Sequence, residues 1–423
     1  MWDRILDHML KGFVTRGALH VTYPDDIMRT YGQARAVPVA VSLRDPALPR
    51  KIVLNSDLAV GEAYMDGRLT IAGDDLDGFL ALVTANVGTA ERLWWRKLAI
   101  GLRRARRVVD QWNPVAKARR NAAHHYDLSS DLYDLFLDDD RQYSCAYFST
   151  PGMTLEAAQA AKTHHIAAKL LLGPDMEVFE IGCGWGGLAM TLAREYGVRV
   201  HGVTLSEEQH RLATQRAEAA GLANRVRFDL RDYRDVTGQY DRVVSVGMFE
   251  HVGVPHYQEY FGHVKACLKP DGVALIHTIG RAAPPGATSP WILKYIFPGG
   301  YVPALSEMAR AVERAGLYPT DLEVWRLHYA ETLKAWHDRF TANEAAARVL
   351  YDERFCRMWR YYLKAAEHTF RHGRQCVFQF QMSRKQDAVP LTRDYLGAAC
   401  QGTAPRTAKQ NRPGSPSAGM VPE

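Results

Sequence analysis

The strongest constraint on the fold is a glycine-rich turn between an apolar segment and a helix-forming one. Residues 178–181 have the pattern of a buried strand, Gly182, Gly184 and Gly187 follow, and residues 188–196 favour a helix. This G-x-G-x-x-G spacing allows a tight turn, close approach of the backbone to a ligand, and close helix–strand packing. Alone the pattern is weak, and a ligand-free turn is the alternative. A nucleotide-like cofactor therefore requires further signs in the surrounding sequence.

The positions of acids and hydroxyls near this turn separate two classes of cofactor. Glu180 lies two residues before the first glycine, where it can face the cationic amino acid end of S-adenosylmethionine. A dinucleotide site would have an acid about twenty residues further on, on the ribose. Here the next strand, 198–203, is followed first by the hydroxyls of Thr204 and Ser206. The pattern favours a methyltransferase core.

Alternating strand-like and helix-like segments extend through the second half of the chain. Such alternation predicts an α/β fold with a doubly wound, mostly parallel, Rossmann-like sheet that binds ligands at the carboxyl ends of its strands. Residues 330–372 are continuously helical in pattern, with a break near 341–343, and predict a helical insertion before a strand at 376–382. The alternating segments are 177–181, 188–196, 198–203, 207–220, 225–229, 242–246, 256–268 and 272–278.

A chain of 423 residues, 47% of them hydrophobic, exceeds one typical domain. We expect a smaller N-terminal domain at 1–100, a basic linker at 101–121 and a catalytic domain at 122–389. In the first domain the run 51–54 has the character of a strand. The segment 390–423 loses periodicity and becomes rich in Pro, Gly, Ser and Ala, so we expect a disordered tail.

Two N-terminal helical patterns complete the first domain, at residues 5–13 and 76–87. The apolar face of the first helix suits core packing, with membrane contact as the alternative. The first 19 residues carry charges and lack the apolar core of a signal peptide, and no run is long enough to span a membrane. Six cysteines without C-x-x-C spacing indicate a reducing cytoplasm and argue against structural zinc.

The net charge of +6 is moderate, so its location matters more than its sum. Residues 101–120 hold seven basic residues against the single acid Asp110, and the Trp94-Trp95 pair precedes them. Such a segment is attracted to anionic lipid headgroups by about 1 kcal/mol per basic residue near the surface. A solvated linker helix, with the tryptophans as an interdomain anchor, is the alternative. We expect an anionic membrane surface as partner and no nucleic acid.

Several strings of polar and aromatic residues precede the core or follow predicted strands. Any one of them is best explained as structural, but together they indicate a site. On them the chain resembles the cyclopropane-fatty-acyl-phospholipid synthases, relatives of the mycolic acid cyclopropane synthases. The strings are His125–Ser129, Gln142–Phe148, Glu180–Gly186, Gly202–Ser206 with Gln209, Asp232–Asp235, Met248–Gly253, His277–Gly280 and Tyr295–Gly300.

The resemblance implies a reaction and a set of catalytic residues. Members transfer a methylene from S-adenosylmethionine to the cis double bond of unsaturated acyl chains in phospholipids, which forms a cyclopropane ring through a carbocation. A bound bicarbonate is the implied base. By motif, its ligands here are Glu250, His277 and Tyr329, with the backbone of Cys145 and Ile279. No metal is implied.

The carbocation and the base set further expectations. Aromatic faces stabilise a cation, and Tyr147, Phe249, Tyr295 and Phe297 are the candidate rings. A carboxylate beside an anion is tolerable if Glu250 is neutral or shares a proton with bicarbonate. The cofactor contacts implied by the resemblance are Tyr143, Ser144, Glu180, Gly182, Cys183, Gly184, Trp185, Gly186, Thr204, Leu205, Ser206, Gln209, Asp232 and Tyr233.

The N-terminal unit is similar to the extra domain of bacterial phospholipid-acting members. This similarity implies lipid or dimer contacts there, a homodimer, and a cytoplasmic enzyme peripherally associated with the inner face of the membrane. Three alternatives remain open. They are a fatty acyl C-methyltransferase giving a methyl-branched or methylene product, a lipid-binding protein that has lost catalysis, and a small-molecule methyltransferase.

Overall fold

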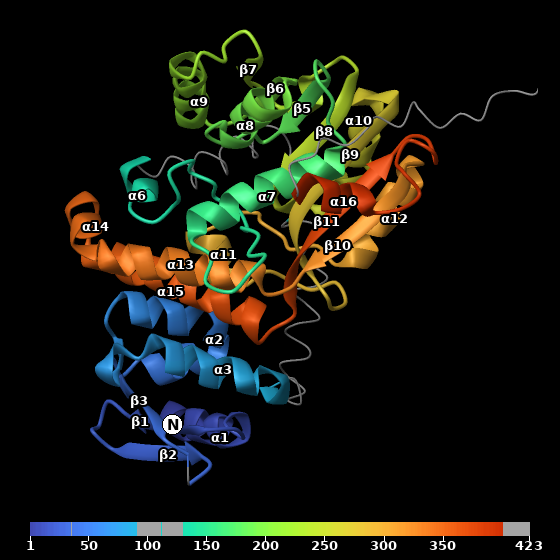
Figure 1. The fold of residues 1–423 in the computed structure, drawn as a ribbon. Helices are drawn as coiled ribbons and strands as arrows, with labels where there is room; N and C mark the ends of the chain where they lie inside the picture. The colour runs from blue at the N-terminus through green and yellow to red at the C-terminus, as the bar shows by residue number, and fades with distance from the viewer. Residues whose placement is uncertain (35, 91–110, 112–129, 401–423) are drawn as a thin grey trace, which may run out of the picture.

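The computed structural model describes residues 1–34, 36–90, 111 and 130–400. The predicted basic linker, the Trp94-Trp95 pair and the His125–Ser129 string lie outside the described residues. The N-terminal elements, blue in Figure 1, form a four-stranded sheet of order β2-β1-β3-β4 with three helices. Their bounds are α1 Trp2–Phe13, β1 Ala18–Thr22, β2 Met28–Gly32, β3 Pro38–Leu43, α2 Leu48–Met65, β4 Leu69–Ile71, η1 Ala72–Asp74 and α3 Leu76–Ala90.

The expected strand at 51–54 is wrong, because these residues belong to helix α2. Pro49 occupies the first turn of that helix, where a missing N–H costs nothing. Ile52 is buried and Leu54 is 63% exposed, so the apolar run does not share one face. The two other N-terminal helices form where the sequence predicts them.

The second sheet has seven strands in the order β10-β11-β9-β8-β5-β6-β7. Strands β5 to β9 pair in parallel, and β11 is antiparallel to both β9 and β10. The predicted doubly wound, mostly parallel sheet is confirmed. Its strands are β5 Glu177–Ile181, β6 Arg199–Thr204, β7 Val226–Leu230, β8 Tyr240–Val246, β9 Leu268–Arg281, β10 Tyr318–Trp325 and β11 Gln375–Ser383.

Helices cover both faces of this sheet because successive strand residues point to opposite sides. Val178 packs in one core with Leu188 of α8, whereas its neighbour Phe179 packs in another with Tyr260 of α10 and Met308 of α12. The remaining elements of the domain are α6 Ser130–Asp134, α7 Leu155–Leu170, α8 Gly187–Tyr196, α9 Glu207–Ala219, η2 Tyr233–Asp235, η3 Phe249–His251, η4 Val254–His256, α10 Tyr257–Cys267, α11 Pro290–Tyr295 and α12 Leu305–Ala315.

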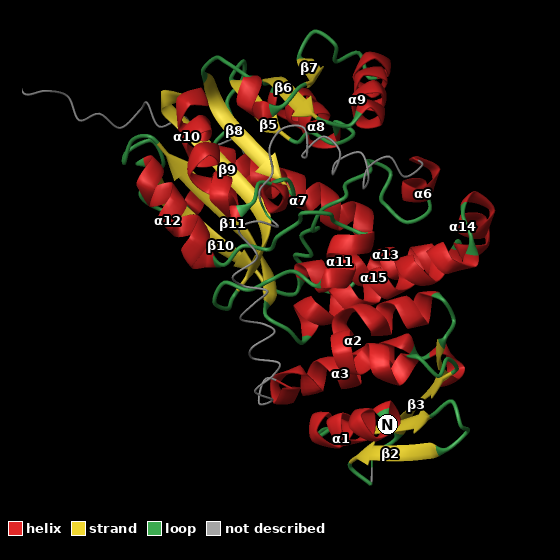
Figure 2. Cartoon of the chain, turned by 180° about the vertical axis from the view of Figure 1, so that it is seen from behind, coloured by secondary structure: helices red, strands yellow, loops and turns green. Residues whose placement is uncertain are grey.

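The helical insertion lies between the large sheet and the N-terminal unit in both views (Figures 1 and 2). It comprises α13 His328–Ala342, α14 Glu344–Leu350 and α15 Glu353–Arg371, so the break predicted near 341–343 is present. Helix α15 packs against α2 and α3, with ion pairs from Arg354 to Asp66 (2.7 Å) and from Lys364 to Asp77 (3.1 Å). The two units are therefore in direct contact.

Part of the expected disordered tail is ordered. Helix α16, Asp394–Cys400, packs against α7, and its Tyr395 is buried with the hydroxyl 3.4 Å from Gln381 Oε1. Tyr395, together with an ion pair from Arg393 to Asp321 (3.1 Å), holds a segment whose composition alone favours disorder. Residues 401–423 lie outside the described part. No helix among the described residues is both long and apolar enough to cross a bilayer.

Candidate active site

The glycine turn joins β5 to α8 at the carboxyl edge of the sheet. Gly182 and Gly186 have φ of +83° and +81°, and a Cβ there would lie 2.9 Å from Met248 and 2.6 Å from the Phe228 ring. At Gly184 a Cβ would meet no atom within 4 Å. The outer two glycines are thus required by packing and backbone conformation, while the middle one leaves open space for a ligand.

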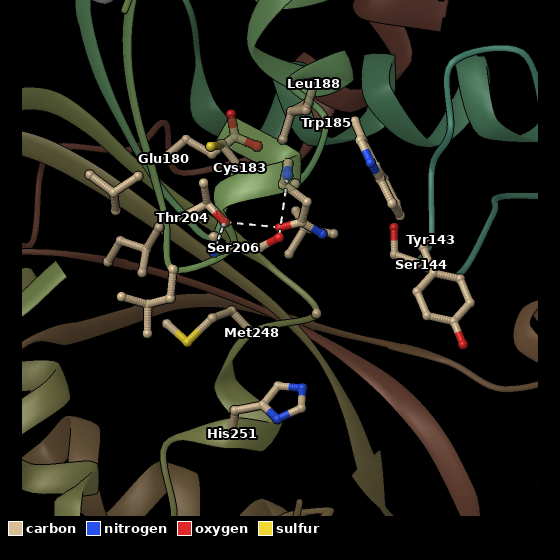
Figure 3. A pocket seen from close by; sticks show the side chains of 18 of the residues that line it. Tyr143, Ser144, Glu180, Cys183, Trp185, Leu188, Thr204, Ser206, Met248 and His251 are labelled. Carbon is tan, nitrogen blue, oxygen red and sulfur yellow. Dashed lines mark hydrogen bonds between the residues drawn. The ribbon is translucent and has the colours of Figure 1, made fainter. Parts of the chain in front are cut away.

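That space belongs to a cavity of about 180 Å³, seen from close by in Figure 3. Gly186 does not line the cavity and acts through the turn instead. All the other predicted cofactor-binding residues line it, namely Tyr143, Ser144, Glu180, Gly182, Cys183, Gly184, Trp185, Thr204, Leu205, Ser206, Gln209, Asp232 and Tyr233.

The hydroxyls after β6 form a local hydrogen-bond network (Figure 3). Thr204 Oγ1 donates to Gln209 Oε1 at 2.9 Å and accepts the Ser206 N–H at 3.2 Å. Ser206 is the N-cap of α9 and accepts the Gln209 N–H at 3.3 Å. The network fixes the loop that forms one wall of the cavity.

The environment of Glu180 shows whether the cavity suits the amino acid end of S-adenosylmethionine. Its side chain is buried at the end of β5, and Oε2 has no hydrogen-bond partner among the described residues. Burial raises the pKa of the carboxyl to about 8. An unpaired buried carboxyl oxygen is costly unless a donor or cation meets it. An ammonium group on the ligand satisfies this need, so the residues present fit the cofactor's amino acid end.

Lys162 is a site residue that the sequence reasoning missed. It projects from α7, is 1% exposed, and lines the same cavity. Its Nζ donates to Gln142 Oε1 at 2.8 Å and Ser144 Oγ at 2.9 Å. Burial lowers the pKa of this lysine to about 8. No motif marks it, because a single lysine in a helical segment is usually solvent-exposed.

A second cavity, of about 90 Å³, adjoins the first. Tyr143, Ser144, Gly247 and His251 line both cavities. The structure brings the five predicted catalytic residues together around the second one, and they come from four separate parts of the chain. They are Cys145, Glu250, His277, Ile279 and Tyr329.

Glu250 lies in η3, just after β8. Its Oε1 accepts the Ile279 N–H at 2.6 Å, and its buried Oε2 has no hydrogen-bond partner among the described residues. Burial raises the pKa of this carboxyl to about 7. Glu250 is therefore poised to hold or share a proton near neutral pH, and its free oxygen fits an anion that carries a proton.

His277 is held by a neighbour that the sequence reasoning also missed. Gln379 of β11 lies opposite His277 in the antiparallel register, and its Nε2 is 3.1 Å from His277 Nδ1. Burial lowers the pKa of His277 well below its usual range, so the ring is neutral. An amide that donates to Nδ1 leaves the proton on Nε2, which makes the histidine a donor.

Of the four candidate rings for a cationic intermediate, only Phe297 lines the second cavity. Phe249 is fully buried against Tyr257 and Tyr260, and Tyr147 stacks on His165. The Tyr295 hydroxyl donates to Glu62. The expectation is not met for these three rings, which do not line the second cavity. Tyr301 lines the cavity, and the sequence reasoning missed it.

Comparison with known proteins supports a methyltransferase site. The model of the mycolic acid cyclopropane synthetase family matches residues 114–380. The chain belongs to this family. The predictions of an S-adenosylmethionine-dependent methyltransferase fold and of an enzyme of the cyclopropane synthase type are confirmed. Residues 5–90 match a domain of unknown function, DUF7884.

Two curated relatives can be aligned with most of this chain. The cyclopropane-fatty-acyl-phospholipid synthase of Escherichia coli K12 is 39% identical over 349 residues, covering 82% of this chain and 89% of the relative. The tuberculostearic acid methyltransferase UfaA1 of Mycobacterium tuberculosis is 36% identical over 402 residues, which cover 90% of this chain and 91% of the relative. The two names describe different products.

A solved structure supports the assignment of the cofactor. The mycolic acid cyclopropane synthase CmaA1, in complex with SAH and CTAB, superposes with a TM-score of 0.60 and 34% identity, covering 64% of this chain and 99% of that one. SAH is the demethylated form of S-adenosylmethionine.

Proposed function

We propose that the protein transfers a methylene from S-adenosylmethionine to the cis double bond of unsaturated acyl chains in membrane phospholipids, forming a cyclopropane ring. One observation carries the proposal. A carboxyl with a pKa near 7 and an unpaired oxygen, Glu250, lies in a small cavity that opens beside the cofactor cavity. Ring closure needs a base that removes a proton from the transferred methyl group, a step that methyl transfer to nitrogen or oxygen lacks.

The bound cofactor supplies an electrophilic methyl group on a sulfonium. An alkene is a poor nucleophile, so the chain must hold it close and dry. The second cavity is lined largely by apolar and aromatic groups, among them Ile292 and Phe297. The Phe297 ring can face the cationic carbon that methyl transfer leaves.

Bicarbonate is the base that we propose for the second cavity. The neutral His277 offers Nε2–H as donor, and Glu250 in its protonated form offers a second one. Tyr329, at the start of α13, and the backbone at Cys145 and Ile279 complete the proposed cradle. The Ile279 N–H already donates to Glu250, so its part is to orient that carboxyl. Removal of a proton from the added methyl then closes the ring.

A second outcome has its own support. The similarity to the tuberculostearic acid methyltransferase covers more of the chain than the similarity to the E. coli synthase. In this alternative the same methyl transfer ends differently. Loss of a proton from a neighbouring chain carbon gives a methyl-branched alkene, and a hydride shift followed by loss of a methyl proton gives a methylene-bearing chain. The two outcomes share the cofactor cavity and differ only in the fate of the carbocation.

One experiment tests both. Purified protein is incubated with S-adenosylmethionine, bicarbonate and vesicles of a cis-monounsaturated phospholipid, and the acyl chains are analysed by mass spectrometry and proton NMR. A gain of one methylene with upfield ring protons is expected. Mass gain without ring protons would establish the branching outcome, and no gain despite cofactor binding would overturn the lipid assignment.

We also propose that the enzyme is cytoplasmic and associates with the inner face of the membrane. Beyond the basic segment at 101–121, support comes from an exposed groove of about 600 Å³ between α1 and α2. Its apolar wall includes Ile5 and Leu54, which are 40% and 63% exposed, and His8 and Lys11 also line it. Apolar and basic side chains together match an anionic phospholipid surface.

Vesicle flotation tests this association. Replacement of Arg103, Arg104, Arg106 and Arg107 by Gln should weaken binding to anionic vesicles and reduce its salt sensitivity. Ile5→Gln with Leu54→Gln should weaken binding at all salt concentrations. Unchanged binding in both variants would contradict the proposal. The homodimer, which rests on the resemblance, is tested by sedimentation velocity, and a monomer at micromolar concentration would refute it.

A further inference from the structure

Lys162 is a buried cation in the cofactor cavity that the proposed chemistry does not use. It is 1% exposed, and a lysine is almost never so buried without a partner for its charge. Among the described residues no carboxylate forms an ion pair with it within 4.0 Å. The acidic groups that act on it through space are Asp138, Cys145, Asp140 and Glu180. Lys162 therefore lacks a close counter-ion among the residues that the structure describes.

The hydrogen bonds of Lys162 leave room for a ligand. An ammonium group has three N–H donors. Two donate to Gln142 Oε1 and Ser144 Oγ, at 2.8 and 2.9 Å, and no further partner is found among the described residues. Since Lys162 and Ser144 both line the cavity, the third donor and the Ser144 hydroxyl are available to a group bound there.

Glu180 supplies an acidic group in the same cavity. Its Oε2 is buried and has no partner among the described residues, and each of the two residues acts electrostatically on the other. The cavity thus presents one buried acid and one buried base, each lacking a partner at one position. An α-amino acid carries an ammonium and a carboxylate in the same compact unit.

We propose that Lys162 binds the carboxylate of the amino acid end of S-adenosylmethionine, together with the Ser144 hydroxyl, while Glu180 receives the ammonium. The assignment rests on the proposed cofactor and adds a carboxylate subsite to it. A charge-assisted pair in a site shielded from water discriminates strongly between ligands with and without the charge.

A purely structural role for Lys162 makes a different prediction. Gln159, on the same face of α7, also fixes the segment 142–144, since its Nε2 donates to the carbonyls of Gln142 and Ser144 at 3.0 Å each. Gln159 is uncharged and 2% exposed, and it does not line the cavity. Gln159→Met therefore disturbs the segment and leaves the charge in place, which makes it the matched control.

The test is isothermal titration of the full-length protein with S-adenosylmethionine and with decarboxylated S-adenosylmethionine, which lacks only the carboxylate. The wild type should bind the first at least about tenfold more tightly. Lys162→Met should reduce this ratio to within about threefold, whereas Gln159→Met should weaken both ligands and keep the ratio. Lys162→Gln, which retains a donor, is the second variant if the methionine variant melts early.

The opposing results are equally specific. An unchanged ratio in a folded Lys162→Met or Lys162→Gln variant, or an equal loss for both ligands in the Lys162 and Gln159 variants, would overturn the carboxylate subsite. Failure of the wild type to bind either ligand would overturn the cofactor assignment and the subsite with it. Lipid turnover does not enter this experiment, so a wrong lipid substrate leaves its outcome unaffected.

Discussion

Glu250 Oε1 accepts the backbone N–H of Ile279 at 2.6 Å, which ties the helical turn η3 that follows β8 to the end of the neighbouring strand β9. One carboxyl oxygen is thereby fixed, and the other is buried without a hydrogen-bond partner in the part of the chain that the structure describes. The Glu250 carboxyl therefore has a fixed position and a raised pKa, a combination that is common in functional carboxyls. The relationship links the geometry of the sheet to the chemistry proposed for the second cavity.

The first prediction concerns turnover. Glu250→Gln keeps an acceptor for the Ile279 N–H but cannot exchange a proton with the proposed base. We expect turnover to fall by about 10² or more, with affinity for S-adenosylhomocysteine changed less than about twofold. Steady-state product assays and titration calorimetry measure the two quantities. Glu259→Gln, on the exposed face of α10, is the control, and full activity of Glu250→Gln would remove Glu250 from the reaction.

The second prediction concerns stability against pH. The pKa of Glu250 rises from 4.5 to about 7 on folding, so the folded state binds this proton more tightly than the unfolded state. The resulting stabilisation is complete below about pH 4.5 and is lost as the pH rises through 7, a change of about 3 kcal/mol. Glu250→Gln lacks this dependence. The difference in unfolding free energy between wild type and variant, from urea titrations at pH 5 and 7.5, should therefore shift toward the variant at the higher pH, and a constant difference would contradict the raised pKa.

The third prediction concerns Gln379 as a positioning residue. Loss of its amide in Gln379→Leu frees His277 Nδ1 to take the proton, which removes the donor from Nε2 in part of the molecules. We expect kcat to fall about tenfold with little change in cofactor affinity. Gln381→Leu is the matched control, because Gln381 is equally buried two residues along β11 but donates to the Lys169 carbonyl instead. Equal kcat loss in both variants would reduce Gln379 to a structural role.

The fourth prediction concerns the contact between the two units. A Cβ at Gly61 of α2 would lie 2.5 Å from Trp291 Nε1, and the next residue, Ile292, lines the second cavity. Gly61→Ala should lower stability by about 1–3 kcal/mol and reduce lipid turnover while cofactor binding persists. The control Gly262→Ala, in α10, adds a methyl where no atom lies within 4 Å and should not destabilise. Thermal melts measure the change in stability, and product assays measure lipid turnover. Normal turnover in Gly61→Ala would show that α11 does not transmit this contact.

The sequence alone determined the local chemistry of the site. The glycine turn, the acid before it and the strings after the strands are short-range patterns, and each reflects a backbone requirement or a side chain at a strand end. Thus the cofactor wall around Glu180 could be predicted without coordinates, and the resemblance carried by the strings pointed to Glu250 and His277 as catalytic candidates. The fold class followed from the alternation of segments, which depends on periodicity.

Only the tertiary structure decided what lies behind those residues. Gln379 reaches His277 through the register of two strands 102 positions apart, and Lys162 enters the cavity from a helix whose pattern marks no inward lysine. Phe249 was expected at the site, but its ring packs against two tyrosines of α10 instead. Such contacts depend on which elements become neighbours, and burial then sets the proton affinities of Glu250 and Lys162. Desolvation is a property of the assembled core, so no short stretch of sequence contains it.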